Sequence, residues 1–181
     1  MNKTVEKKRT SAAKKVLKQA AEKYWYDHPC VGYKQLSENE IVLTNGFLVY
    51  FGSPIIDINR TLSPENFPDV ERFIPNYGDK DIHELDVDQV KQNLNKAKAE
   101  WKGKRPKFKS LHKLSLDANT IVKNMIGDDV YFDSELVILC CNMIGGKTYT
   151  IQVRNVLEAC IIRCEENDNF CLLMPLIKNA E

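Results

Sequence analysis

Residues 66–75 read NFPDVERFIP, and this stretch decides how the chain is divided. Proline fixes its own φ at about −65° and pushes the preceding residue towards an extended conformation. Pro68 and Pro75 therefore predict an extended, non-helical connector. The alternative is a proline-rich surface loop between domains.

The composition is that of a folded protein. The chain has 181 residues, of which 43% are hydrophobic and 28% charged, with a net charge of +1. This length fits one domain of ordinary size or two small ones. No apolar run approaches the roughly eighteen residues of a membrane span, and the basic N-terminus lacks the apolar segment of a secretory signal. We therefore expect a cytoplasmic protein without a membrane partner.

Six cysteines are present without a CxxC pair. Five of them lie among apolar neighbours, and we expect them to be small buried hydrophobes: Cys140, Cys141, Cys160, Cys164 and Cys171. The alternative is a zinc site built from the first four of these, but adjacent cysteines are poor partners in a tetrahedral site. We predict no metal and no cofactor.

Three helices are expected from apolar residues at helical spacing and from capping residues. The first spans 11–24, with Ser11 as its N-cap, and the second spans about 88–101. The third spans about 118–126 and follows Asp117.

Strands are expected on both sides of the connector. Residues 32–36, 40–44 and 47–52 are strand-like, and Asn45-Gly46 predicts a hairpin because both residues tolerate positive φ. After the third helix, antiparallel strands are expected in the segments 129–133, 136–142, 147–153, 157–164 and 170–177. For residues 153–163 a helix remains an alternative, because a short apolar run does not settle the periodicity.

Basic residues are concentrated in two blocks. Residues 3–23 hold eight Lys and Arg against two Glu, and residues 91–113 hold nine against one. These blocks suggest one positive face that attracts a polyanion, the alternative being two solvated helix surfaces.

Two short segments of the sequence are similar to each other, and no catalytic motif is present. The segments IHELDVD (82–88) and LHKLSLD (111–117) suggest a reused strand–cap–helix unit, which places His83 and His112 at equivalent positions. No nucleophile elbow, zinc-protease, P-loop or dinucleotide-binding pattern occurs. We therefore expect no enzymatic activity.

The connector resembles the one that precedes the last domain of bacterial sliding clamps, the β subunit of the replicative DNA polymerase. The matching residues are Phe67, Pro68, Asp69, Arg72, Ile74 and Pro75. The end of the chain, 159–177, is similar to the last clamp hairpin, and 42–52 to a strand-turn-strand of the family. The resemblance implies an α+β, DNA-clamp-like fold of repeated β-α-β-β units, with antiparallel sheets on one side and helices on the other. It divides the chain into two clamp-like subdomains, 1–75 and 76–181, and implies that Phe67 and Ile74 anchor the connector between them.

The resemblance further implies a shortened, phage- or prophage-type clamp that supports replication and binds double-stranded DNA without reading sequence. The expected DNA contacts are Lys14, Lys15, Lys18, Lys91, Lys98, Lys102, Lys104, Arg105 and Lys107. Asn45, Phe47 and Leu48 stand where the family has Asp, His and Arg. The DNA contact made by that arginine is therefore not carried over to this chain.

By the same resemblance, a polymerase or other replication protein inserts an apolar peptide into a groove lined by Met174, Pro175 and Leu176. The alternative for these three residues is an ordinary core edge strand. A chain of this length cannot close around a duplex alone, so ring formation requires a homo-oligomer. Two other functions remain open: a clamp-like protein-interaction module that does not bind DNA, and a small enzyme.

Overall fold

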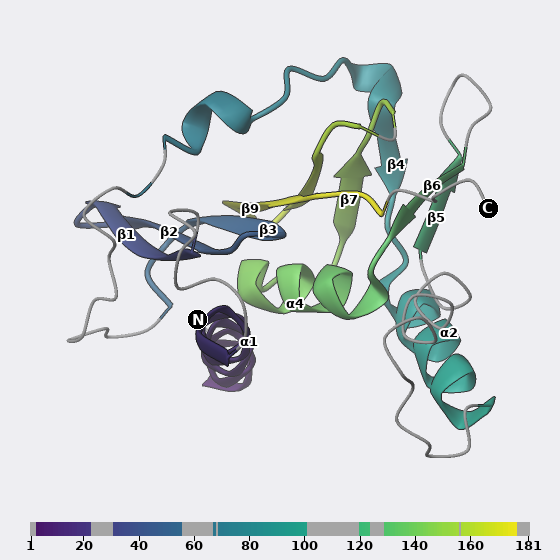
Figure 1. The fold of residues 1–181 in the computed structure, drawn as a ribbon, viewed down its shortest axis with the longest axis horizontal. Coiled ribbons are helices and arrows are strands. Elements are labelled where there is room, and N and C mark those ends of the chain that lie inside the picture. Colours follow the sequence, from purple (N-terminus) through teal and green to yellow (C-terminus); the bar gives the residue numbers. More distant parts are fainter. Residues whose placement is uncertain are drawn as a thin grey trace.

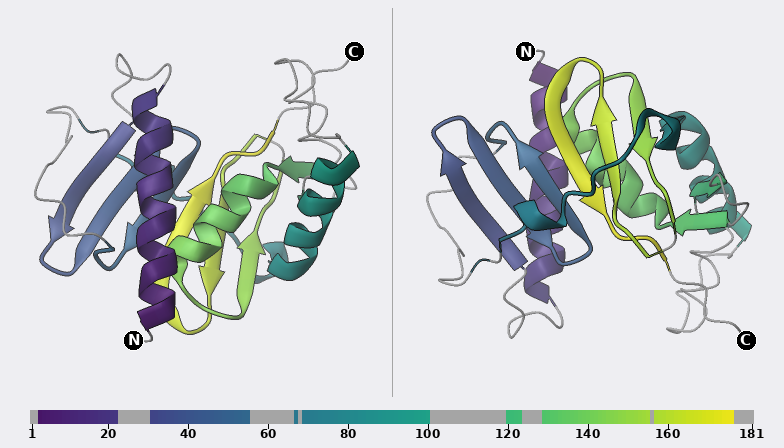
Figure 2. Two further views of the ribbon diagram at one scale, coloured as in Figure 1. Left: turned by 90° about the horizontal axis from the view of Figure 1, so that it is seen from below. Right: turned by 90° about the horizontal axis from the view of Figure 1, so that it is seen from above.

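Three α-helices lie on one face of an antiparallel sheet in the part of the chain that the computed structural model describes (Figure 1). That part comprises residues 3–22, 31–55, 67, 69–100, 120–123, 129–155 and 157–176. The helices are α1 (Lys3–Glu22), α2 (Val87–Glu100) and α4 (Ser134–Ile144). Seen from below, they lie side by side across the sheet with α4 in the middle, and α1 and α2 each pack against α4 (Figure 2).

The main sheet contains seven described strands, and all neighbouring strands pair antiparallel. Their order is β1 (Val31–Ser37), β2 (Glu40–Asn45), β3 (Leu48–Gly52), β9 (Asn167–Leu173), β8 (Cys160–Cys164), β7 (Tyr149–Gln152) and β4 (Ile82–Glu84). A smaller sheet pairs β5 (Thr120–Lys123) with β6 (Asp129–Phe132). The α+β fold class with helices on one side of the sheet is thus confirmed.

The hairpin between β2 and β3 turns at Asn45-Gly46, as predicted. Gly46 has a φ of 88°, which a glycine adopts without steric cost. The Asn45 Oδ1 atom accepts hydrogen bonds from the backbone N–H groups of Phe47 and Leu48, each at 3.1 Å. The asparagine therefore serves to shape the turn.

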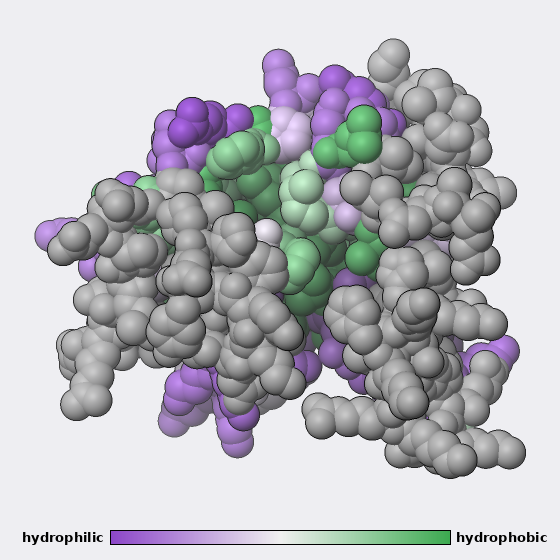
Figure 3. Space-filling view, viewed as in Figure 1, coloured by the Kyte–Doolittle hydropathy of each residue, from purple (hydrophilic) through white to green (hydrophobic). Residues whose placement is uncertain are grey.

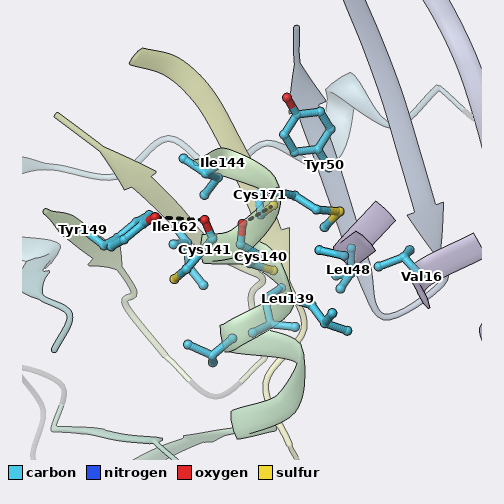
Figure 4. Packing of buried hydrophobic residues seen from close by; sticks show 14 of the residues in the cluster. Val16, Leu48, Tyr50, Leu139, Cys140, Cys141, Ile144, Tyr149, Ile162 and Cys171 are labelled. Atoms are coloured by element: carbon cyan, nitrogen blue, oxygen red, sulfur yellow. Dashed lines mark hydrogen bonds between the residues drawn. The ribbon is translucent and has the colours of Figure 1, made fainter. Parts of the chain in front are cut away.

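The main core lies between the sheet and the helices. The cysteines at 140, 141, 160, 164 and 171 are all free and buried, which confirms the prediction for them. Figure 4 shows three of them, Cys140, Cys141 and Cys171, within the core. The Tyr149 hydroxyl donates a 2.9 Å hydrogen bond to the carbonyl oxygen of Cys141 and thereby joins β7 to α4.

The connector packs on the opposite face of the sheet, over a second apolar cluster. Because strand side chains alternate between faces, Val42, Phe51 and Leu172 point away from the helices. Phe67 and Ile74 pack against this cluster, which confirms them as anchors. The connector is not extended throughout, however, because η1 (Glu71–Phe73) forms a single 3-10 turn.

Two elements differ from the sequence prediction. Residues 136–142 were expected as a strand but belong to the helix α4, which begins after Asp133 and ends at Gly145. The Asp133 side chain caps the helix, since its Oδ1 atom accepts hydrogen bonds from the backbone N–H groups of Glu135 and Leu136. Residues 120–123 were expected as helix but form β5, because pairing with β6 satisfies their backbone.

Helix α1 begins at Lys3, eight residues before the predicted N-cap Ser11, which is an exposed mid-helix residue. Arg9, which is buried against α4 and β3, holds these additional turns in place.

Residues Cys160–Cys164 form a strand, as expected, and not the helix that was the alternative for this segment. The segment 111–117 lies outside the described residues. No described helix is both long and apolar enough to pass through a membrane.

Candidate nucleic-acid interface

The solvent side of α1 is covered by lysines. In the described side chains of this helix, the buried positions are Arg9, Ala12, Ala13 and Val16, which share one stripe at helical spacing. Glu6 is the one acidic group among the described side chains of this helix. The exposed lysines fall on the side opposite the buried stripe: Lys3, Lys7, Lys8, Lys14, Lys15 and Lys18. Figure 3 shows hydrophilic residues protruding below α1 and hydrophobic residues in the layer of the sheet.

Arg9 fixes the rotation of α1 about its axis. Its side chain is 2% exposed and donates from Nε to the carbonyl oxygen of Met143, at 2.9 Å, and from Nη2 to the Tyr50 hydroxyl, at 2.9 Å. Burial raises the pKa of Tyr50 to about 12, although the Arg9 charge opposes this shift, so the phenol remains protonated. With Arg9 locked inward, the lysines of α1 must face solvent.

Helix α2 adds a second set of cations on the same side of the sheet. Val90 is buried and Leu94 is half-buried, while Lys91, Lys96 and Lys98 are exposed. Lys91 Nζ lies 2.8 Å from Asp88 Oδ1, one turn away. Hydrogen bonding to Lys91, together with its charge, lowers the pKa of Asp88.

A groove of about 320 Å³ lies where the three helices meet. Its apolar lining comes from all three helices, and its charged rim carries Lys8 and Lys15 from α1, Lys98 from α2 and Glu135 from α4. Glu135 forms ion pairs with both Lys15 and Lys98. At the rim of the groove, lysines from α1 and α2 therefore share the Glu135 carboxylate.

The structure places the predicted cations as follows. Lys14, Lys15, Lys18, Lys91 and Lys98 are all exposed on helices of one face. Lys14 lines a second depression of α1, together with Lys3 and Lys7. Four predicted contacts lie outside the described residues, one from the lysine row of the second helix and three from the basic turn after it: Lys102, Lys104, Arg105 and Lys107.

Two charged residues of the groove, Lys8 and Glu135, were not predicted from the sequence. Lys8 precedes Lys15 by two helical turns, so the spacing was available once the helix was extended to Lys3. Glu135 had no such signal, because its segment was read as the approach to a strand.

The predicted partner-binding residues lie at the C-terminal end of β9. Met174 is 46% exposed and its backbone N–H donates a 3.0 Å hydrogen bond to the carbonyl oxygen of Phe47, which is itself 48% exposed. Pro175 and Leu176 are half-buried, and Leu176 donates from its backbone to Tyr131 at 2.8 Å. Met174, directly after β9, therefore lies opposite Phe47 of the β2–β3 turn, and the side chains of both residues are exposed.

Among the described residues, no group of three or more His, Cys, Asp or Glu side chains is placed to hold a metal ion. No protein-family profile matches the chain, and no curated protein sequence matches it with significance.

Solved structures do match. The DNA polymerase III β subunit of Thermotoga maritima aligns with a TM-score of 0.58 at 13% identity, over 93% of this chain and 63% of that chain. A Pseudomonas aeruginosa sliding clamp solved with a ligand gives a TM-score of 0.60 at 11% identity, over 96% and 64%. Caulobacter crescentus pol III β gives 0.57 at 12% identity, over 96% and 64%. The chain thus spans less than two thirds of the length of these proteins, and the predicted resemblance is confirmed at the level of the fold, which is that of bacterial DNA sliding clamps.

Proposed function

We propose that the lysine-rich helix face binds duplex DNA without reading its bases, and that the protein acts as a clamp-like accessory of replication rather than as an enzyme. The observation that carries this proposal is the convergence of exposed lysines from α1 and α2 on one face of a clamp fold. Ammonium groups attract phosphates at any sequence and release condensed counterions when they do so. Such contacts allow a protein to move along a duplex.

The proposal predicts salt-sensitive binding that depends on the helix face. A variant with Lys14, Lys15, Lys91 and Lys98 changed to Gln should bind a random duplex more weakly. The slope of log K against log salt should become shallower by roughly two to four units, since each lost phosphate contact removes about 0.9. Fluorescence anisotropy over a salt series measures this slope.

The matched control is Lys34→Gln. Lys34 is exposed and pairs in register with Val42, whose side chain lies on the connector side of the sheet. This change should leave affinity within about twofold, because an exposed charge acts mainly within a Debye length of about 10 Å. An equal loss of DNA affinity in the control and in the variant with four lysines changed, or no DNA binding by the unaltered protein, would refute the proposal.

We further propose that the chain consists of two clamp-like subdomains, 1–75 and 76–181, and that copies self-associate when they surround DNA. The β3–β9 pairing supports a continuous sheet across the two parts. Light scattering with and without a nicked circular duplex tests the ring. A protein that stays monomeric under both conditions excludes encirclement while leaving simple DNA binding open.

A second candidate function is the capture of an apolar peptide from a replication partner. The exposure of Phe47 and Met174 beside each other favours it. Met174→Asp should abolish binding of a clamp-binding peptide, whereas Ile82→Asp, at an exposed apolar residue on the sheet edge, should not. Peptide binding without DNA binding would make the protein an interaction module.

A further inference from the structure

We propose that Glu135 is an internal competitor for DNA phosphates, and that it limits how tightly the helix face holds a duplex. This inference rests on the DNA-binding function proposed above. It adds that Lys15 and Lys98 exchange between the Glu135 carboxylate and a phosphate, so that the contact at the centre of the face is replaceable.

The contacts of the carboxylate carry the argument. Lys98 binds its Oε1 atom from α2, and Lys15 lies 3.9 Å from its Oε2 atom from α1. One carboxylate is thus shared by cations from the helices on either side of α4. Each carboxylate oxygen has one lysine as its partner. Two oxygens of a DNA phosphate in this position could be bound by the same two lysines.

These groups are accessible to a ligand. The side chains of Lys15, Lys98 and Glu135 are 52%, 49% and 40% exposed. Exposed ion pairs of this kind contribute little net stability, because water and salt compete for both partners. A phosphate approaching the groove can therefore take over the two lysines at small cost, with Glu135 turning to solvent.

Glu135 is present as the anion that this role requires. Burial would raise its pKa, but the hydrogen bond and charge of Lys98, with the charge of Lys15, outweigh burial and lower the pKa. The groove rim also carries Lys8, so three lysines and one carboxylate line the groove. The site stays net positive and attracts DNA, while the carboxylate offsets part of the attraction.

The test is Glu135→Gln, which keeps the size of the side chain and removes its charge. Affinity for a random duplex at low salt should rise by roughly two- to tenfold, and the salt slope should steepen by about one unit. The control is Glu71→Gln, which changes the net charge equally on the connector, at the opposite face of the sheet. It should change affinity by less than about twofold.

A second variant separates competition from a purely structural role. When Lys15 and Lys98 are both changed to Gln, adding Glu135→Gln should have little further effect on affinity, because the competitor has lost what it competes for. An equal gain in that background, an equal gain from Glu71→Gln, or unchanged or weakened binding by Glu135→Gln contradicts the inference. If the unaltered protein binds DNA, such a result refutes the inference alone. If it does not bind DNA, both proposals fail.

Discussion

Arg9 of α1 and Met143 of α4 are joined by a buried hydrogen bond of 2.9 Å, which runs from the guanidinium Nε to the last-turn carbonyl of the neighbouring helix. The same guanidinium reaches Tyr50 on β3. The Arg9 side chain thus connects α1 to the neighbouring helix α4 and to strand β3 of the sheet. These contacts fix the direction in which the lysines of α1 point.

We expect Arg9→Met to lower the free energy of unfolding by roughly 2–4 kcal/mol, because the Met143 carbonyl loses a buried charged donor. Urea unfolding followed by circular dichroism measures the change. Lys7→Met, at an exposed position of the same helix, should cost less than about 0.5 kcal/mol. Equal effects of the two changes would show that Arg9 is not a structural tie.

Gly145 should not tolerate a side chain. It ends α4 with a φ of +76°, and a Cβ atom there would lie 2.8 Å from the Cδ atom of Arg9. Gly145→Ala should therefore destabilise the fold by about 1–3 kcal/mol. Gly78→Ala is the control, because its Cβ would meet only an Asp81 oxygen at 3.8 Å. A Gly145→Ala protein as stable as the control contradicts the described end of α4.

The buried cysteines should be unreactive in the folded protein. Burial raises the pKa values of Cys141, Cys160 and Cys171, which disfavours the nucleophilic thiolate. In a Cys30→Ser variant, reaction with a thiol reagent should be at least about a thousandfold slower than in urea, since it requires opening of the core. Fast labelling of the native protein, or fewer than the five free thiols of the buried set in urea, goes against this expectation.

The ion pairs of Glu135 should make stability sensitive to acid. Its pKa is lowered in the folded state, so its contribution is present above the ordinary glutamate pKa and is lost as pH falls through the folded value. Between roughly pH 5 and pH 3, urea midpoints should therefore fall slightly more steeply for the unaltered protein than for Glu135→Gln, and the difference should be small because these ion pairs are exposed. Parallel curves would show that the ion pairs do not contribute to stability.

Local signals were sufficient for several elements. The Asn45-Gly46 turn was predictable because its chemistry is contained in two residues and their immediate backbone. The anchors of the connector were also correct, since Phe67 and Ile74 are apolar residues flanked by prolines. The lysine rows of α1 and α2 followed from helical spacing alone.

Helix α4 was missed because it is apolar around most of its circumference. Val137, Leu139, Cys140, Cys141 and Met143 are all buried, so the segment lacks the polar stripe of an amphipathic helix. Its boundaries were nevertheless encoded by Asp133 as N-cap and by Gly145 as the left-handed C-cap. Because Glu135 lies on this helix, the misreading also hid the carboxylate at the centre of the lysine face.

The most direct test of the central claim is a lysine acetylation footprint of the protein with and without duplex DNA, read by mass spectrometry. If the helix face binds DNA, DNA protects Lys14, Lys15, Lys18, Lys91 and Lys98 and leaves Lys34, on the connector side of the sheet, as reactive as before. Protection of Lys34 without protection of the helix lysines, or uniform reactivity at saturating DNA, would contradict this claim.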